Sequence, residues 1–112
     1  MNAEGVVQRQ LEAYNARDLE RFLAAYGEGI RMFHPPAVEP VMIGKEAVGK
    51  YYAAQRFCHA GLHAALVSRI VLGNKVIDHE RISGVREQPF EVAVVYEVSN
   101  GLIVCTWSYA AD

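Results

Sequence analysis

A pair of two-residue turns in the second half of the chain most constrains the fold. Gly73-Asn74 and Asn100-Gly101 each lie between two runs rich in β-branched and aromatic residues. From about His63 onwards, apolar and polar residues alternate with the period of a half-buried β-strand. A Gly/Asn dipeptide between two such runs is typical of a tight hairpin, because both residues tolerate positive φ. The sequence therefore predicts two long antiparallel hairpins, over "HAALVSRIVLGNKVIDHERISG" and "FEVAVVYEVSNGLIVCTWSYA".

The first half of the chain has helical patterns instead. Apolar residues recur at helical spacing in "VVQRQLEAY", and Asp18 is a predicted N-cap for a second helix, "LERFLAAY", which Gly27 and Gly29 should end. The stretch "GKEAVGKYYAAQRF" predicts a third helix. A short strand, "IRMFH", precedes Pro35-Pro36, which cannot continue a ladder. This order of elements predicts an α+β fold with an antiparallel sheet.

The composition indicates one globular domain over residues 1–112. The chain is 52% hydrophobic and 21% charged, a balance that excludes a disordered protein. Its formal net charge of -2 gives no electrostatic reason to expect nucleic acid or an anionic membrane as a partner. No apolar run approaches the roughly 20 residues that span a bilayer. The opening "MNAEGVVQRQ" lacks the features of a signal peptide, so we expect a cytoplasmic protein in which Cys58 and Cys105 are reduced thiols.

Several motifs along the chain resemble one known superfamily. They are "AYNARDL" in the helical half, "HPP" after the early strand, "GKEA" at the third helix and "YEVSNGLIVCTW" in the second hairpin. Together they resemble the SnoaL-like, nuclear-transport-factor-2-like superfamily, and most closely its ketosteroid-isomerase and polyketide-cyclase branches. The resemblance implies a cone-shaped, curved antiparallel sheet wrapped around three N-terminal helices, a cystatin-like α+β roll. It also implies a largely apolar pocket open at one end and a homodimer formed through the sheet.

The same resemblance shows where this chain departs from the ketosteroid isomerases. The isomerase base is an aspartate just after the first strand, and that position matches His34. The tyrosine donor of the first helix matches Gln10, with Tyr14 one turn later, and the protonated aspartate donor matches Tyr96. Because none of the three catalytic residues is retained, we do not expect steroid isomerisation by that machinery. The fold also hosts binding modules, so it does not by itself determine the function.

The first predicted hairpin contains four consecutive ionisable residues, in "VIDHERI". A two-residue turn at Gly73-Asn74 sets the register of the two strands, and strand side chains alternate between the two faces of a sheet. The residues that follow the turn therefore divide into one face with Ile77, His79 and Arg81 and another with Val76, Asp78 and Glu80. The predicted cross-strand pairs are Arg69–Asp78, Ser68–His79 and Val67–Glu80.

Two interpretations of this strand remain open. If His79 lies on the concave face, it could act as a base or donor, because an unperturbed imidazole changes charge close to neutral pH; otherwise it is a structural histidine satisfied by Ser68 or a carbonyl. Asp78 and Glu80 are interpreted as structural charges or charges of a dimer face, with Asp78 also a candidate pocket residue. A register slip of one residue would exchange the two faces.

The remaining candidates are aromatic or histidine side chains. The rings of Tyr14, Tyr52, Tyr96 and Trp107, with Phe57, offer apolar surface to a ligand, although residues at such spacing are often plain core. His59 and His63 lie four apart beside Cys58, but Gly61 disfavours a helix there and no carboxylate completes a metal site. We therefore expect no metal and no cofactor.

The functional hypothesis is proton transfer next to a carbonyl of a small hydrophobic molecule, as in an isomerase, cyclase or dehydratase. His34 or His79 would be the base, and the hydroxyl of Tyr14 or Tyr96 would stabilise the enolate oxygen. The alternative is a module of the same fold without catalysis, which binds a ligand or only dimerises.

Overall fold

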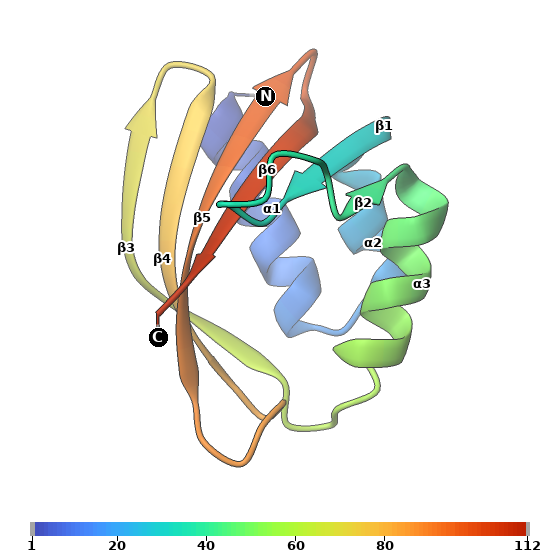
Figure 1. The fold of residues 1–112 in the computed structure, drawn as a ribbon, viewed down its shortest axis with the longest axis vertical. Helices are drawn as coiled ribbons and strands as arrows, with labels where there is room; N and C mark the ends of the chain where they lie inside the picture. The colour runs from blue at the N-terminus through green and yellow to red at the C-terminus, as the bar shows by residue number, and fades with distance from the viewer. Residues whose placement is uncertain (1, 112) are drawn as a thin grey trace.

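The computed structural model describes residues 2–111. Within this range the helices pack against the concave side of one curved, unclosed sheet (Figure 1). The predicted α+β class, with a curved sheet around N-terminal helices, is confirmed. The elements are α1 (Ala3–Asn15), α2 (Leu19–Ala24), β1 (Tyr26–Phe33), β2 (Met42–Ile43), α3 (Lys45–Gln55), β3 (His63–Leu72), β4 (Lys75–Ser83), β5 (Phe90–Ser99) and β6 (Leu102–Ala110).

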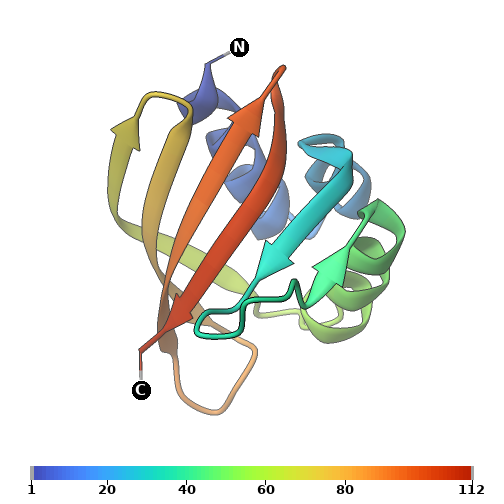
Figure 2. The same cartoon turned by 45° about the horizontal axis from the view of Figure 1, so that its top comes forward.

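The sheet is mixed rather than purely antiparallel. Its strand order is β2-β1-β6-β5-β4-β3, and β1 runs parallel to β6 while every other neighbouring pair is antiparallel. Figure 2 shows β6 between β1 and β5, with the helices behind the sheet. Parallel neighbours need a long connection, and here everything from β2 to β5 lies between them in the chain.

The two N-terminal helices begin at side-chain caps. The Asn2 side chain accepts a hydrogen bond from the Gly5 amide at 2.8 Å, and the predicted cap Asp18 accepts one from the Arg21 amide at 3.1 Å. The predicted end of the second helix is wrong, because α2 stops at Ala24 and Tyr26 and Gly27 belong to β1. The Ile103 amide donates to the Ala25 carbonyl at 2.9 Å, so β6 captures the backbone that would otherwise have continued the helix.

Both predicted hairpins are present, and their turns place Gly73, Asn100 and Gly101 at positive φ. The predicted pairs Arg69–Asp78 and Ser68–His79 are confirmed. The predicted pair Val67–Glu80 is wrong, since Leu66 lies opposite Glu80 and the register shifts between Leu66 and Ser68. One extra residue in β3 leaves the alternation of β4 intact, as expected for a β-bulge.

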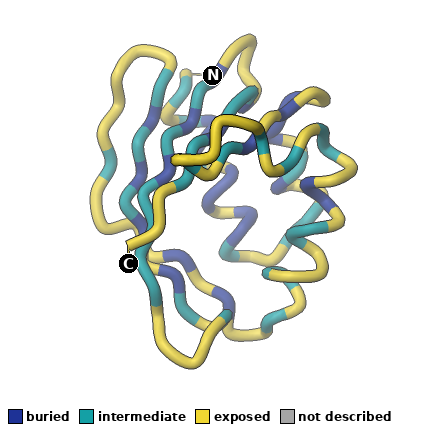
Figure 3. Tube along the Cα trace, viewed as in Figure 1, coloured by how far each residue is buried: buried dark blue, intermediate teal, exposed yellow. Residues whose placement is uncertain are grey.

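The core lies between the helices and the concave face of the sheet. Buried segments alternate along the strands and follow the side of α1 that faces them (Figure 3). Phe22 is completely buried and packs against the rings of Tyr26 and Tyr52, at centroid distances of 5.0 and 4.7 Å. Within residues 2–111, no helix is both long enough and apolar enough to cross a bilayer.

Candidate functional site

A cavity of about 360 Å³ lies between α1, α3 and the concave faces of β4, β5 and β6. This volume lies at the lower end of the range typical of small-molecule sites, about 300–1,000 Å³. One part of the wall is apolar, with Ile82, Phe90 and Val92. The other part contains ionisable and hydrogen-bonding groups, namely Gln10, Tyr14, Tyr26, Tyr52, Arg56, Glu80 and Tyr96.

Glu80 is the buried acid of this cavity. The residue is 6% exposed, and its Oε2 atom has no hydrogen-bond partner among residues 2–111. Burial, and then the charge of Asp78, raise the pKa of Glu80 to about 7, because Arg69 and Tyr96 offset only part of the effect. A carboxyl with a pKa near neutrality both takes and returns protons, as a general acid–base catalyst must.

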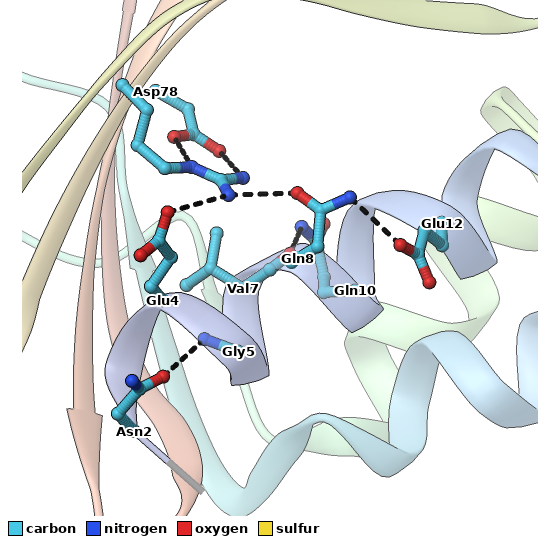
Figure 4. A network of polar contacts seen from close by, with 9 residues as sticks. Asn2, Glu4, Gly5, Val7, Gln8, Gln10, Glu12 and Asp78 are labelled. Atoms are coloured by element: carbon cyan, nitrogen blue, oxygen red, sulfur yellow. Dashed lines mark hydrogen bonds and ion pairs between the residues drawn. The ribbon is translucent and has the colours of Figure 1, made fainter.

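Asp78, on the same face of β4, is held in an ion pair. The prediction that it lines the cavity is wrong. It is completely buried and accepts two hydrogen bonds from Arg69, from Nε at 2.7 Å and from Nη2 at 2.9 Å. Arg69 Nη1 also donates to Gln8 Oε1 at 2.8 Å and lies 3.9 Å from the Glu4 carboxylate (Figure 4). This network joins β3 and β4 to α1 and leaves Glu80 as the acid without an arginine bound to it.

A chain of neutral polar groups leads from β1 across α1 to β5. The Tyr26 hydroxyl donates to Gln10 Oε1 at 3.2 Å, and Gln10 Nε2 donates to the Tyr96 hydroxyl at 3.5 Å. Burial raises the pKa of both tyrosines well above 10, so both stay protonated. Because the Tyr96 oxygen accepts from Gln10, its own proton can be donated to Glu80, and a hydrogen bond from Tyr96 lowers the pKa of that carboxyl.

A second pair, Tyr14 and Arg56, brings a positive charge to the cavity wall. Arg56 Nη1 donates to the Tyr14 hydroxyl at 2.9 Å. Burial raises the pKa of Tyr14, although the charge of Arg56 counteracts part of this effect. The Tyr14 oxygen accepts from Arg56, so its own hydrogen can be donated to a ligand, and the adjacent cation strengthens it as a donor.

Four of the predicted site residues line the cavity. Tyr14, Tyr52 and Tyr96 do so from α1, α3 and β5, and His34 does so from the segment after β1, where it is exposed. No group of three or more His, Cys, Asp or Glu residues in the described chain is arranged to hold a metal ion.

The hypothesis that placed His79 in the cavity is wrong. His79 lies on the outer face of the sheet, where its Nε2 is 2.5 Å from Glu91 Oε1 and the side chain is 43% exposed. Trp107 is also on the outer face, because its neighbours in the strand, Thr106 and Ser108, line the cavity. Its ring stacks on that of Phe33 with 5.7 Å between the centroids. Phe57 does not line the cavity either and packs behind it against Phe22 and Tyr14.

The interpretation of Glu80 as a charge of a dimer face on the outer side of the sheet is also wrong, since it is buried in the cavity wall. A signal for this orientation exists in the sequence. Val76 and Ile82 bracket Asp78 and Glu80 at even spacing, so two apolar residues share their face. The opposite face carries Lys75, His79, Arg81 and Ser83 with one apolar residue, Ile77. No comparable pattern indicated Arg56 or Arg86, which lie near the ends of elements.

The SnoaL-like domain family matches residues 7–106, which is most of the chain. The fold agrees with that match. The chain belongs to the SnoaL-like family, as the motifs implied. None of the curated proteins compared with it matches.

Solved structures show the same fold. A candidate ketosteroid isomerase from Kribbella flavida DSM 17836 is similar at TM-score 0.86 and 14% identity, over 98% of this chain and 78% of that one. An uncharacterized cystatin-fold protein from Novosphingobium aromaticivorans is similar at TM-score 0.87 and 19% identity, over 96% and 97%. A candidate polyketide cyclase from Sinorhizobium meliloti is similar at TM-score 0.78 and 15% identity, over 93% of each chain. At these identities the similarity concerns the fold alone.

Proposed function

We propose that this protein is a cofactor-independent enzyme that moves a proton at a carbon next to the carbonyl group of a small molecule. The observation that supports this most strongly is Glu80, a buried carboxyl in a cavity wall with an unpartnered oxygen and a pKa of about 7. Structural carboxylates in cores are normally paired through both oxygens, as Asp78 is, so a carboxyl that faces a cavity with one oxygen unpartnered favours a catalytic role.

The reaction begins when the Glu80 carboxylate takes the proton. The electron pair of the broken C–H bond forms a double bond to the carbonyl carbon. The carbonyl π electrons move to the oxygen, which carries the negative charge of the resulting enolate. Return of the proton from Glu80 to another carbon gives isomerisation. Attack of the enolate carbon on a second carbonyl, whose oxygen then takes this proton, gives cyclisation. Loss of a β-hydroxyl that takes the same proton and leaves as water gives dehydration. A positioned base of this kind contributes about 10²–10⁴-fold.

The enolate oxygen is stabilised by Tyr14. Its hydroxyl is oriented by Arg56 and donates to the oxygen as negative charge develops there. Removing one donor of this kind costs about 10²–10³-fold in turnover. Tyr96 has a positioning role, because Gln10 fixes its hydroxyl near Glu80. His34, at the exposed part of the wall, is the remaining candidate for returning the proton.

Two of the similar structures favour this reaction class. One is named a candidate ketosteroid isomerase and another a candidate polyketide cyclase. The residues carrying the reaction here differ from those implied by the resemblance, because the base is on β4 rather than after β1.

The test is hydrogen–deuterium exchange of small cyclic ketones in D₂O, followed by nuclear magnetic resonance. We expect the wild-type protein to catalyse exchange at the carbons beside the ketone. The exchange rate of Glu80→Gln should be lower by a factor of about 10²–10⁴. Glu87→Gln, an exposed residue between β4 and β5, is the matched control and should exchange at the wild-type rate. Equal rates for wild type and Glu80→Gln would contradict the assignment. Ketones that bind without exchanging would favour the alternative, a non-catalytic ligand-binding module.

A further inference from the structure

Two arginines lie against a single aromatic ring in the cavity wall. The Cζ atoms of Arg56 and Arg86 are 5.6 and 4.0 Å from the centroid of the Phe90 ring, and all three residues line the cavity. A guanidinium that lies over an aromatic ring is attracted by the negative face of that ring. Its N–H groups point outward from the rim of that plane, so they remain available for an anion.

Neither of these arginines has an acidic partner. Within residues 2–111, no carboxylate forms an ion pair with Arg56 or Arg86. The side chain that Arg56 does bind is the neutral hydroxyl of Tyr14. Arg69, by contrast, is saturated by Asp78, Gln8 and Glu4. A positive charge in a partly enclosed space is stabilised by an anion with which it can form charge-assisted hydrogen bonds.

The arrangement also separates the charges along the cavity. Arg56 and Arg86 lie beside Phe90 at the start of β5, whereas Glu80 and Tyr96 lie further inside, in the middle of β4 and toward the far end of β5. Tyr14 connects the two regions, because its hydroxyl binds Arg56. A molecule with an anionic group at one end and a carbonyl at the other matches this order of contacts.

We propose that the substrate is a small organic carboxylate, bound through its carboxylate by Arg56 and Arg86 so that its carbonyl group lies toward Tyr14 and Glu80. The placement of the carbonyl rests on the proposed function, but the anion site does not. A cavity of about 360 Å³ accommodates a compact ring compound of this kind. The proposal narrows the small hydrophobic molecule expected from the sequence to an acid with an apolar body.

The test compares two probes of similar size and shape, the anionic 3-oxocyclohexanecarboxylate and its neutral carboxamide, by titration calorimetry. We expect the wild-type protein to bind the carboxylate at least about tenfold more tightly, as a charge-assisted hydrogen bond allows. Arg86→Gln should weaken carboxylate binding about tenfold to hundredfold and leave the carboxamide unchanged. Arg56→Lys keeps the charge but loses the planar fork, so we expect an intermediate loss.

The matched control is Arg81→Gln, which removes the same charge from an exposed residue on the outer face of β4. It should bind both probes as the wild type does. Arg86 lies in an exposed loop, so if Arg56→Lys fails to fold, Arg86→Gln decides the result. Equal affinity for the two probes, or binding of neither at about 10 mM, would overturn the anion site.

Deuterium exchange of the same two probes separates this inference from the proposed function. A preference for the carboxylate that Arg86→Gln abolishes, without exchange in any variant, supports the anion site and contradicts the proton transfer. Exchange of both probes at equal rates, unaffected by Arg86→Gln, supports the proton transfer and overturns the anion site.

Discussion

Asp78 and Glu80 lie two residues apart on one face of β4, yet only Asp78 is held by an arginine. Arg69 binds both oxygens of Asp78, whereas Glu80 Oε2 has no partner among residues 2–111. The charge of Asp78 then raises the pKa of Glu80 beyond the effect of burial. A structural ion pair thus stands beside the acid assigned to catalysis and tunes it.

The first prediction concerns stability and pH. Glu80 has a pKa of about 7 in the folded protein against 4.5 for an ordinary glutamate, so between these values the folded state holds a proton that the unfolded state releases. The contribution of this protonation to the stability of the folded state is fully present below pH 4.5 and is lost as the pH rises through about 7. The loss is at most about 3 kcal/mol. Urea unfolding measures the free energy of unfolding at about pH 5 and about pH 8. Between these pH values the free energy should decline less for Glu80→Gln than for the wild type, and equal declines would contradict the raised pKa of Glu80.

The second prediction concerns the ion pair. Asp78→Asn leaves Arg69 buried without its acid, and we expect the free energy of unfolding to fall by about 3–5 kcal/mol. Glu4→Gln is the control, because Glu4 is 54% exposed and 3.9 Å from the same guanidinium, so its loss should be at most about 1 kcal/mol. Chemical denaturation measures both. Similar losses for the two variants would show that the pair does not anchor β4 to α1.

The third prediction separates the two histidines considered as bases. His79→Ala should leave turnover unchanged, because His79 faces away from the cavity, and should lower stability by at most about 1 kcal/mol through loss of the exposed Glu91 pair. His34→Ala should reduce turnover by about tenfold or more if His34 returns the proton. Steady-state kinetics on one ketone compares them. A larger effect of His79→Ala would reverse the assignment of the two faces.

The fourth prediction concerns assembly. We expect a homodimer through the outer sheet face, where Ile70 is 57% and Leu72 is 68% exposed beside Ile77. Burying apolar side chains of this size favours association, so Ile70→Lys should shift the protein toward monomer. Light scattering at micromolar concentration measures the mass, with Lys50→Gln on the exposed side of α3 as the control. A monomeric wild-type protein would contradict the expectation.

The local structure was predictable because it depends on neighbouring residues. Asp18 caps a helix through the amide of Arg21, and Gly73 and Asn100 adopt the positive φ that tight turns require. The same local rules placed Arg69 opposite Asp78, since a two-residue turn sets the register that follows it. They could not place the bulge beside Val67, because the backbone there adjusts to the curvature of the whole sheet.

The tertiary structure alone decided which groups share the cavity. Alternation divides β4 into two faces, and Val76 and Ile82 favour burial of the face that carries Glu80 rather than the face that carries His79. It does not say which groups from other elements meet Glu80 there. Likewise, α2 ends before Ala25 because the amide of Ile103 in β6, nearly eighty residues later in the chain, donates a hydrogen bond to the Ala25 carbonyl. The sequence by itself determined the turns, the caps and the two faces of each strand. Only the packed fold brought Arg56, Glu80 and Tyr96 around one space, because burial and long-range pairing depend on residues far apart in the chain.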